Sequence, residues 1–68
     1  MTLPPIETVA AKVHEAWVND NRKNGITTRI SSVSGEEQMV PYEQLSESIK
    51  EYDRQLVRTV YAAIEASE

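Results

Sequence analysis

The sequence predicts an α+β domain that is mainly helical, with two antiparallel helices and a short, irregular β-hairpin-like segment between them. Apolar residues recur at helical spacing in residues 6–24 and again in residues 48–64, while β-branched residues and a Ser-Gly turn occupy the stretch between these repeats. The chain has 68 residues, which is enough for one small domain. We therefore expect a single domain over residues 1–68.

The first helix is expected to begin after Pro4 or Pro5, because proline suits the first turn of a helix. It should end near Asn24-Gly25, since Gly25 can adopt the left-handed conformation that closes a helix. One face of this helix is apolar and should pack in the core, with residues Ile6, Val9, Ala10, Val13 and Trp17.

Residues 26–39 are predicted to form the hairpin-like segment. The Ser34-Gly35 pair supplies a turn. The strands would be short, and a two-stranded ribbon is only marginally stable unless it packs against a helix. Residues typical of a strand alternate at the start of the segment, at Ile26, Thr28 and Ile30.

The second helix is expected to start at Ser46 or Ser48, after a turn or single helical turn that follows Pro41. Ser48 and Glu51 have the spacing of a capping box. One apolar stripe, widened by Val57, is expected to face the first helix. It consists of Ile49, Tyr52, Leu56, Val60, Ala63 and Ile64.

The composition excludes several classes of protein. The net charge is −4 and the seven Lys and Arg residues are scattered, so there is no continuous basic surface for a nucleic-acid polymer. No apolar run approaches the ~20 residues that cross a membrane, and the start lacks the features of a signal peptide. Without cysteine the chain is not a disulfide scaffold. We expect a cytoplasmic protein with no membrane partner.

A thin core predicts self-association. A domain of this size buries only about 60% of the surface that its unfolded chain exposes. The chain has no cysteine to cross-link it and no phenylalanine to fill its core. A homo-oligomer is therefore expected to cover the remaining apolar surface.

The sequence offers no catalytic set, so we expect a protein that is not an enzyme and that needs no cofactor. His14 is the single histidine, and the chain has neither a cysteine nor a serine in a nucleophile elbow. One histidine among scattered glutamates does not make a metal site. We interpret His14 as a hydrogen-bonded structural residue.

Asp53 falls inside the apolar stripe of the second helix, where a buried carboxylate needs partners. It can accept backbone N–H groups from the turn at residues 40–45, or it can accept a hydrogen bond from the Trp17 indole or from His14. A catalytic acid is less favoured, because no second carboxylate accompanies it on the stripe. We interpret Asp53, like Tyr52 beside it, as structural.

Lys50, Arg54 and Tyr61 share one flank of the second helix, with Val57 between them. Arg54 can bind a phosphate or carboxylate with two parallel hydrogen bonds, and Lys50 adds a point charge. This flank is therefore a candidate anion site. The alternative is a solvated helix face on which both cations pair with Glu47 or other nearby acids.

Several of these residues occur in an order that resembles the ryanodine-receptor (RyR) repeat, in its stand-alone bacterial or phage form. The resemblance covers about Ile6 to Ile64. The chain departs from the family pattern in two places. Ile26-Thr27-Thr28 follows the glycine where the family commonly has aromatic residues, and Gln38-Met39 stands where the family often has histidine and proline. The matching residues are His14, Trp17, Gly25, Pro41-Tyr42, Lys50 and Tyr52-Asp53-Arg54.

The resemblance implies a non-enzymatic module that binds a small anionic, nucleotide-derived ligand, either to sense a signal or to sequester it. RyR repeats in channels contribute to a peripheral module that accommodates adenine nucleotides. Lys50 and Arg54, together with Tyr61, would hold the anion, and an exposed ring face of Trp17 or Tyr42 would contact the base. The alternative function is a protein-interaction or structural assembly module with no small-molecule ligand.

Overall fold

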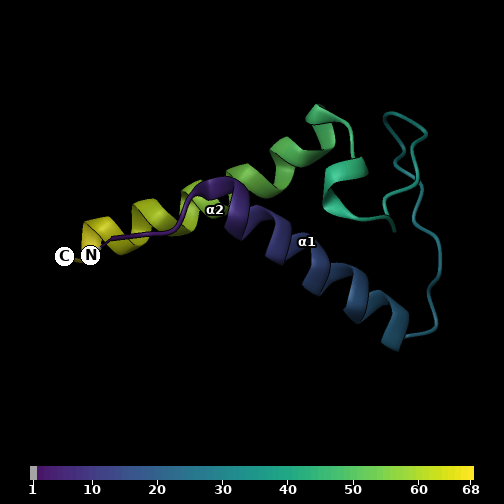
Figure 1. Cartoon of the computed structure of the whole chain (residues 1–68), viewed down its shortest axis with the longest axis horizontal. Coiled ribbons are helices and arrows are strands. Elements are labelled where there is room, and N and C mark those ends of the chain that lie inside the picture. Colours follow the sequence, from purple (N-terminus) through teal and green to yellow (C-terminus); the bar gives the residue numbers. More distant parts are fainter. Residues whose placement is uncertain (1) are drawn as a thin grey trace.

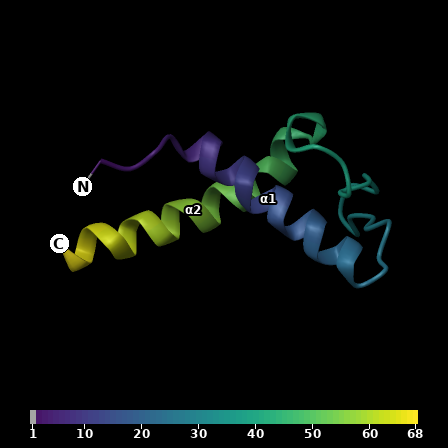
Figure 2. The same ribbon diagram turned by 60° about the horizontal axis from the view of Figure 1, so that its bottom comes forward.

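A computed structural model describes residues 2–68, which form two long helices joined by a loop (Figure 1). Helix α1 covers Ile6–Lys23, a 3-10 helix (η1) covers Tyr42–Gln44 and helix α2 covers Glu47–Ser67. The two long helices cross at a wide angle instead of lying side by side as the predicted antiparallel pair, and the loop lies at one end of the molecule (Figures 1 and 2). This confirms the prediction of a mainly helical domain with two helices. No helix within residues 2–68 is long and apolar enough to cross a membrane.

Helix α1 ends as the sequence predicts. Gly25 adopts a left-handed conformation with φ of 76°. Its N–H donates to the Arg22 carbonyl at 3.0 Å, and the next N–H, of Ile26, donates to the Asn21 carbonyl at 2.9 Å. These two bonds form a Schellman motif, which satisfies carbonyls that a helix end would otherwise leave without partners.

Helix α2 begins after Ser46, but the predicted capping box of Ser48 and Glu51 is wrong. Ser48 lies inside the helix, and the Ser46 side chain makes no capping hydrogen bond. The Ser46 hydroxyl instead donates to Glu36 at 2.6 Å, and its backbone N–H donates to the same carboxylate at 2.9 Å. A carboxylate from the loop therefore fixes the chain at the start of α2.

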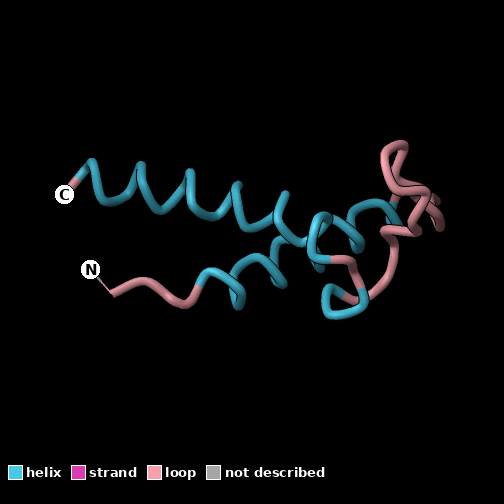
Figure 3. Tube along the Cα trace, turned by 90° about the horizontal axis from the view of Figure 1, so that it is seen from above, coloured by secondary structure: helices cyan, strands magenta, loops and turns pink. Residues whose placement is uncertain are grey.

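The predicted β-hairpin is also wrong, because residues 2–68 contain no strand (Figure 3). One isolated antiparallel bridge joins Ile30 and Glu37. Two backbone hydrogen bonds flank it, from the Ser31 N–H to the Glu36 carbonyl at 2.9 Å and from the Gln38 N–H to the Arg29 carbonyl at 2.8 Å. The ladder goes no further, because the Glu37 carboxylate accepts the N–H groups of Arg29 at 2.7 Å and Met39 at 3.0 Å. So short a ribbon could not compete with these local hydrogen bonds.

The core lies where the first half of α2 and the η1 turn pack against α1. Ala10 of α1 is fully buried there, and His14 and Asn21 are the buried polar residues of the same helix. The buried apolar residues of the central cluster are Ala10, Tyr42, Leu45, Ile49 and Val57.

Helix α2 is rotated relative to the predicted stripe. Ile49 and Val57 are buried, but Tyr52, Leu56 and Val60 are more than half exposed, at 61%, 58% and 56%. Within residues 2–68, α1 is the one long helix that α2 meets. It therefore covers one part of a broad apolar face and leaves the rest open. The second half of α2 runs past α1, where the Tyr61 hydroxyl donates to the Pro4 carbonyl at 2.7 Å.

This rotation predicts different effects for the same substitution at two positions of α2. Val57→Ala should lower the free energy of unfolding by about 1 to 3 kcal/mol, because it removes two buried methyl groups. Val60→Ala is the matched control and should stay within about 0.5 kcal/mol, since its side chain is exposed. Urea unfolding followed by circular dichroism measures both. Equal losses would place the core on the Val60 side and contradict this packing.

Candidate functional site: two pockets on either side of His14

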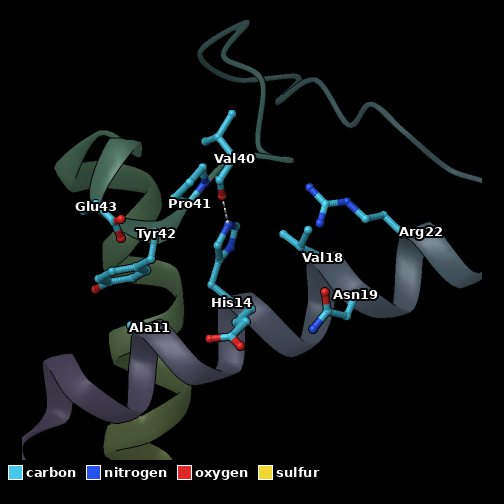
Figure 4. A pocket seen from close by; sticks show the side chains of 10 residues that line it. Ala11, His14, Val18, Asn19, Arg22, Val40, Pro41, Tyr42 and Glu43 are labelled. Atoms are coloured by element: carbon cyan, nitrogen blue, oxygen red, sulfur yellow. Dashed lines mark hydrogen bonds between the residues drawn. The ribbon is translucent and has the colours of Figure 1, made fainter.

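His14 lies at the centre of the domain and links three segments. Its buried ring donates from Nε2 to the Val40 carbonyl at 2.7 Å (Figure 4). Its Nδ1 lies 3.8 Å from Asp53 Oδ2 on α2. The hydrogen bond fixes a proton on Nε2, because a carbonyl oxygen can only accept. One pocket opens on the Val40 side of this ring and another on the Asp53 side.

The first pocket, here the Arg22 pocket, is a cavity of about 320 Å³ between α1 and the chain that leads into η1 (Figure 4). The Arg22 side chain lies over Val18 and points toward Val40. Its guanidinium makes no hydrogen bond or ion pair with any residue of the 2–68 range. The pocket is lined by Ala11, His14, Glu15, Val18, Asn19, Arg22, Val40, Pro41, Tyr42 and Glu43.

The Arg22 pocket combines apolar walls with charges of both signs. Val18, Val40 and Pro41 provide apolar surface. The two carboxylates among its lining residues belong to Glu15, which pairs with Lys12 at 3.7 Å outside the pocket, and to Glu43. A ligand with an anionic group and several hydroxyl groups matches this distribution of apolar, cationic and acidic side chains.

The second pocket, here the Asp53 groove, has a volume of about 290 Å³ and lies between the two helices. The Trp17 ring is partly exposed and lies tilted against the His14 ring, with centroids 5.6 Å apart. Burial raises the pKa of the Asp53 carboxyl, and the charge of His14 partly offsets this. The groove is lined by Val13, His14, Trp17, Gln38, Ile49, Tyr52, Asp53 and Leu56.

Arg54 lies on the predicted anion flank, but carboxylates surround it. Its guanidinium pairs with Glu7 of α1, with Glu47 at 2.8 Å and with Glu51 at 3.4 Å. Its side chain is only 17% exposed. Hydrogen bonds from Arg54 lower the pKa values of Glu7 and Glu47, and the same bonds raise the pKa of Arg54. This is the paired arrangement that the sequence analysis weighed as its alternative.

Lys50 and Tyr61 are engaged as well. Lys50 Nζ lies 3.6 Å from Glu47 Oε1 and 5.4 Å from the centre of the Tyr42 ring. The hydroxyl of Tyr61 is bonded to the Pro4 carbonyl. The predicted flank therefore presents bound cations instead of an open anion site. Glu7 occupies the guanidinium of Arg54 on this flank, although it lies 47 residues before Arg54 in the sequence.

The two aromatic residues predicted to contact a base lie in different pockets. Tyr42 lines the Arg22 pocket, is buried, and donates its hydroxyl to Glu7 at 2.8 Å. Trp17 lines the Asp53 groove. Both rings lie near the His14 ring, with centroids 5.6 Å away for Trp17 and 6.2 Å away for Tyr42.

Arg22 is the residue that the sequence analysis did not single out. Its spacing gives a signal: it follows Val18 by four residues and His14 by eight, which places all three along one side of the helix. Within residues 2–68, no group of three histidine or carboxylate side chains converges as a metal site would require.

The carboxylates around Arg54 and Arg58 predict an acid-sensitive fold. Glu7, Glu47 and Glu51 have pKa values below their ordinary 4.5 because they accept hydrogen bonds from these arginines. Their stabilisation is therefore present above pH 4.5 and is lost as the pH falls through the lowered values. Asp53 acts in the opposite direction, because its pKa is raised. Thermal melts from pH 7 to pH 3 should show a falling midpoint.

Arg54→Gln should flatten this pH dependence, because it removes the donor shared by Glu7 and Glu47. Lys12→Gln is the control, since Lys12 pairs only with an exposed glutamate and should leave the dependence unchanged. An Arg54→Gln protein that loses stability with acid as steeply as the parent would contradict this account.

One of three comparisons with known proteins identifies the family of the chain. A search of curated proteins and a search of solved structures found no match. The model of the RyR domain family matches residues 3–68, which is nearly the whole chain. The chain therefore belongs to the RyR domain family.

Proposed function

We propose that this RyR domain is a non-enzymatic binding module for a small anionic, nucleotide-derived ligand, and that the ligand binds in the Arg22 pocket. The observation that carries the proposal is the Arg22 guanidinium, which lies over an apolar cavity without a partner in residues 2–68. The module would sense or sequester its ligand in the cytoplasm, a reducing compartment that suits a chain without cysteine.

The contrast between Arg22 and Arg54 supports this location. Arg54 is held by three carboxylates, so a ligand phosphate there would have to displace Glu7 or Glu47. Arg22 has no such competitor. Its planar guanidinium can donate two parallel hydrogen bonds to a phosphate, and the apolar surface of Val18 beneath it reduces competition from water.

The other lining residues suit the sugar and the base. Ribose hydroxyls can donate to the Glu43 carboxylate, in the way that an acidic residue binds the ribose of a dinucleotide. The apolar walls at Val40 and Pro41 can contact a base. A cavity of about 320 Å³ is close to the lower end of the range for drug-sized ligands.

Calorimetric titration with AMP, ADP-ribose and a cyclic dinucleotide tests the proposal. At least one should bind with a dissociation constant below 1 mM, or about −4 kcal/mol. Arg22→Gln should weaken that binding at least tenfold, because it removes the single arginine that lines the pocket. Lys23→Gln is the matched control: Lys23 is the adjacent cation, also lacks a partner in residues 2–68, and does not line the pocket.

Two outcomes would contradict the proposal. One is that no compound of the three binds below 1 mM, although circular dichroism shows a folded protein. The other is that Arg22→Gln and Lys23→Gln weaken binding equally, which would mean that the loss comes from the lower net positive charge of this region and not from a contact in the pocket.

A second candidate function is protein interaction or assembly, and the second half of α2 favours it. This half runs past α1 (Figure 2). Its side chains at Val60 and Ala63 are apolar and exposed. A copy of the same chain can cover such a surface, in line with the homo-oligomer expected from the thin core.

Light scattering over a dilution series tests self-association. The parent chain should form a dimer or a larger assembly at tens of micromolar, and Val60→Lys should shift it to a monomer by placing a charge on the exposed apolar surface. Ala62→Lys adds the same charge on another exposed side of α2 and should not change the assembly. A parent chain that stays monomeric while folded would exclude this candidate.

A further inference from the structure

We propose that the Asp53 groove is a second binding site, and that it takes a small organic cation, a primary ammonium or guanidinium group on an apolar or aromatic arm. This site has the opposite charge preference to the Arg22 pocket and does not depend on the function proposed for that pocket. The proposal rests on the composition of the groove and on a carboxylate within it that has no hydrogen-bond donor in residues 2–68.

The groove is built from both helices and is mainly apolar. Trp17 comes from α1, and Tyr52 and Leu56 come from α2. All three side chains are more than one third exposed, so their apolar surfaces are open to a ligand. Aromatic faces attract cations through their ring quadrupoles, and arginine or ammonium groups gain most from this where water is partly excluded.

Asp53 supplies the charge of the groove. Its side chain is only 17% exposed, and it makes no hydrogen bond with any residue of the 2–68 range. His14 Nδ1 lies 3.8 Å away, which exceeds a hydrogen-bond distance and makes an ion pair only when the imidazole is protonated. Neither lysine nor arginine lines the groove. The carboxylate thus lacks a donor in a place where ionised groups are usually paired.

His14 cannot fill this role in its neutral form. Its Nε2–H is committed to the Val40 carbonyl at 2.7 Å, so the neutral ring presents the lone pair of Nδ1 to the Asp53 carboxylate. Burial raises the pKa of Asp53, because the ionised carboxylate is partly removed from water. A ligand N–H group would supply the missing donor and the missing positive charge at once.

The arrangement sets the selectivity of the site. An anionic ligand would meet the Asp53 carboxylate with no cation to offset it. A neutral alcohol of the same shape can fill the apolar walls but gains no ionic hydrogen bond, and bonds to charged groups are about twice as strong as neutral ones. The groove volume of about 290 Å³ suits a compact amine.

The test is a titration of the ¹⁵N-labelled protein with phenethylamine and agmatine, followed by NMR, with 2-phenylethanol as the uncharged analogue. At least one amine should bind with a dissociation constant of a few millimolar or less, and phenethylamine should bind at least tenfold more tightly than the alcohol. The shifted amides should cluster around Trp17, Tyr52 and Asp53.

Variants identify the groups responsible. Asp53→Asn should weaken phenethylamine binding at least tenfold and leave the weaker binding of the alcohol unchanged. Glu65→Gln removes an exposed carboxylate from the same helix, outside the groove, and should leave amine binding unchanged. Tyr52→Ala should weaken amine binding severalfold without unfolding the domain, because Tyr52 is exposed. If Asp53→Asn fails to fold, Tyr52→Ala and the alcohol comparison carry the test.

Three results would overturn the proposal. They are equal binding of the amine and the alcohol, shifts that map to the Arg22 pocket instead of the groove, and absence of amine binding up to 20 mM, which is about the affinity of a nonspecific contact. A folded Asp53→Asn protein that keeps the parent affinity would also overturn it.

Discussion

The contact between Glu7 and Arg54 is the interaction on which the arrangement of this domain depends most. Glu7 lies in the first turn of α1, and it receives hydrogen bonds from Arg54 of α2 and from the hydroxyl of Tyr42 in η1. One carboxylate therefore joins all three helical segments. The ion pairs of Glu7 are partly exposed, so each adds little to the free energy of unfolding. Their main effect is on orientation: they hold the polar flank of α2 toward α1, with Tyr52 and Leu56 facing outward. The Asp53 groove exists because of that rotation.

The limits and the local chemistry of the helices could be predicted from the sequence. The expected first helix ends within a residue of Lys23, where Gly25 has the left-handed conformation anticipated for it. The turn after Pro41 and the start of α2 at Ser46 were also predictable. In each case the deciding residue lies within a few positions of the feature that it controls, so local propensity was enough.

The rotation of α2, the loop and the candidate site could not be predicted in the same way. Periodicity shows that a helix has a broad apolar face, but it does not show which part of that face a single partner helix will cover. The hairpin prediction counted β-branched residues and could not foresee that Glu37 would take the backbone donors of the loop. Likewise, Arg54 resembled a free cation until the fold brought a distant glutamate beside it, and Arg22 drew no notice because its pocket wall is formed by Val40 and Pro41 of another segment.

The positions of the two ends of the described chain determine how this domain can be joined to a larger protein. Residues 2–5 and the end of α2 lie at the same end of the molecule, away from the loop (Figures 1 and 3). A segment with adjacent ends can be placed within a surface loop of a larger protein with little disturbance of the host fold. Neither pocket is lined by the residues next to the two ends, so both would remain clear of the point of attachment.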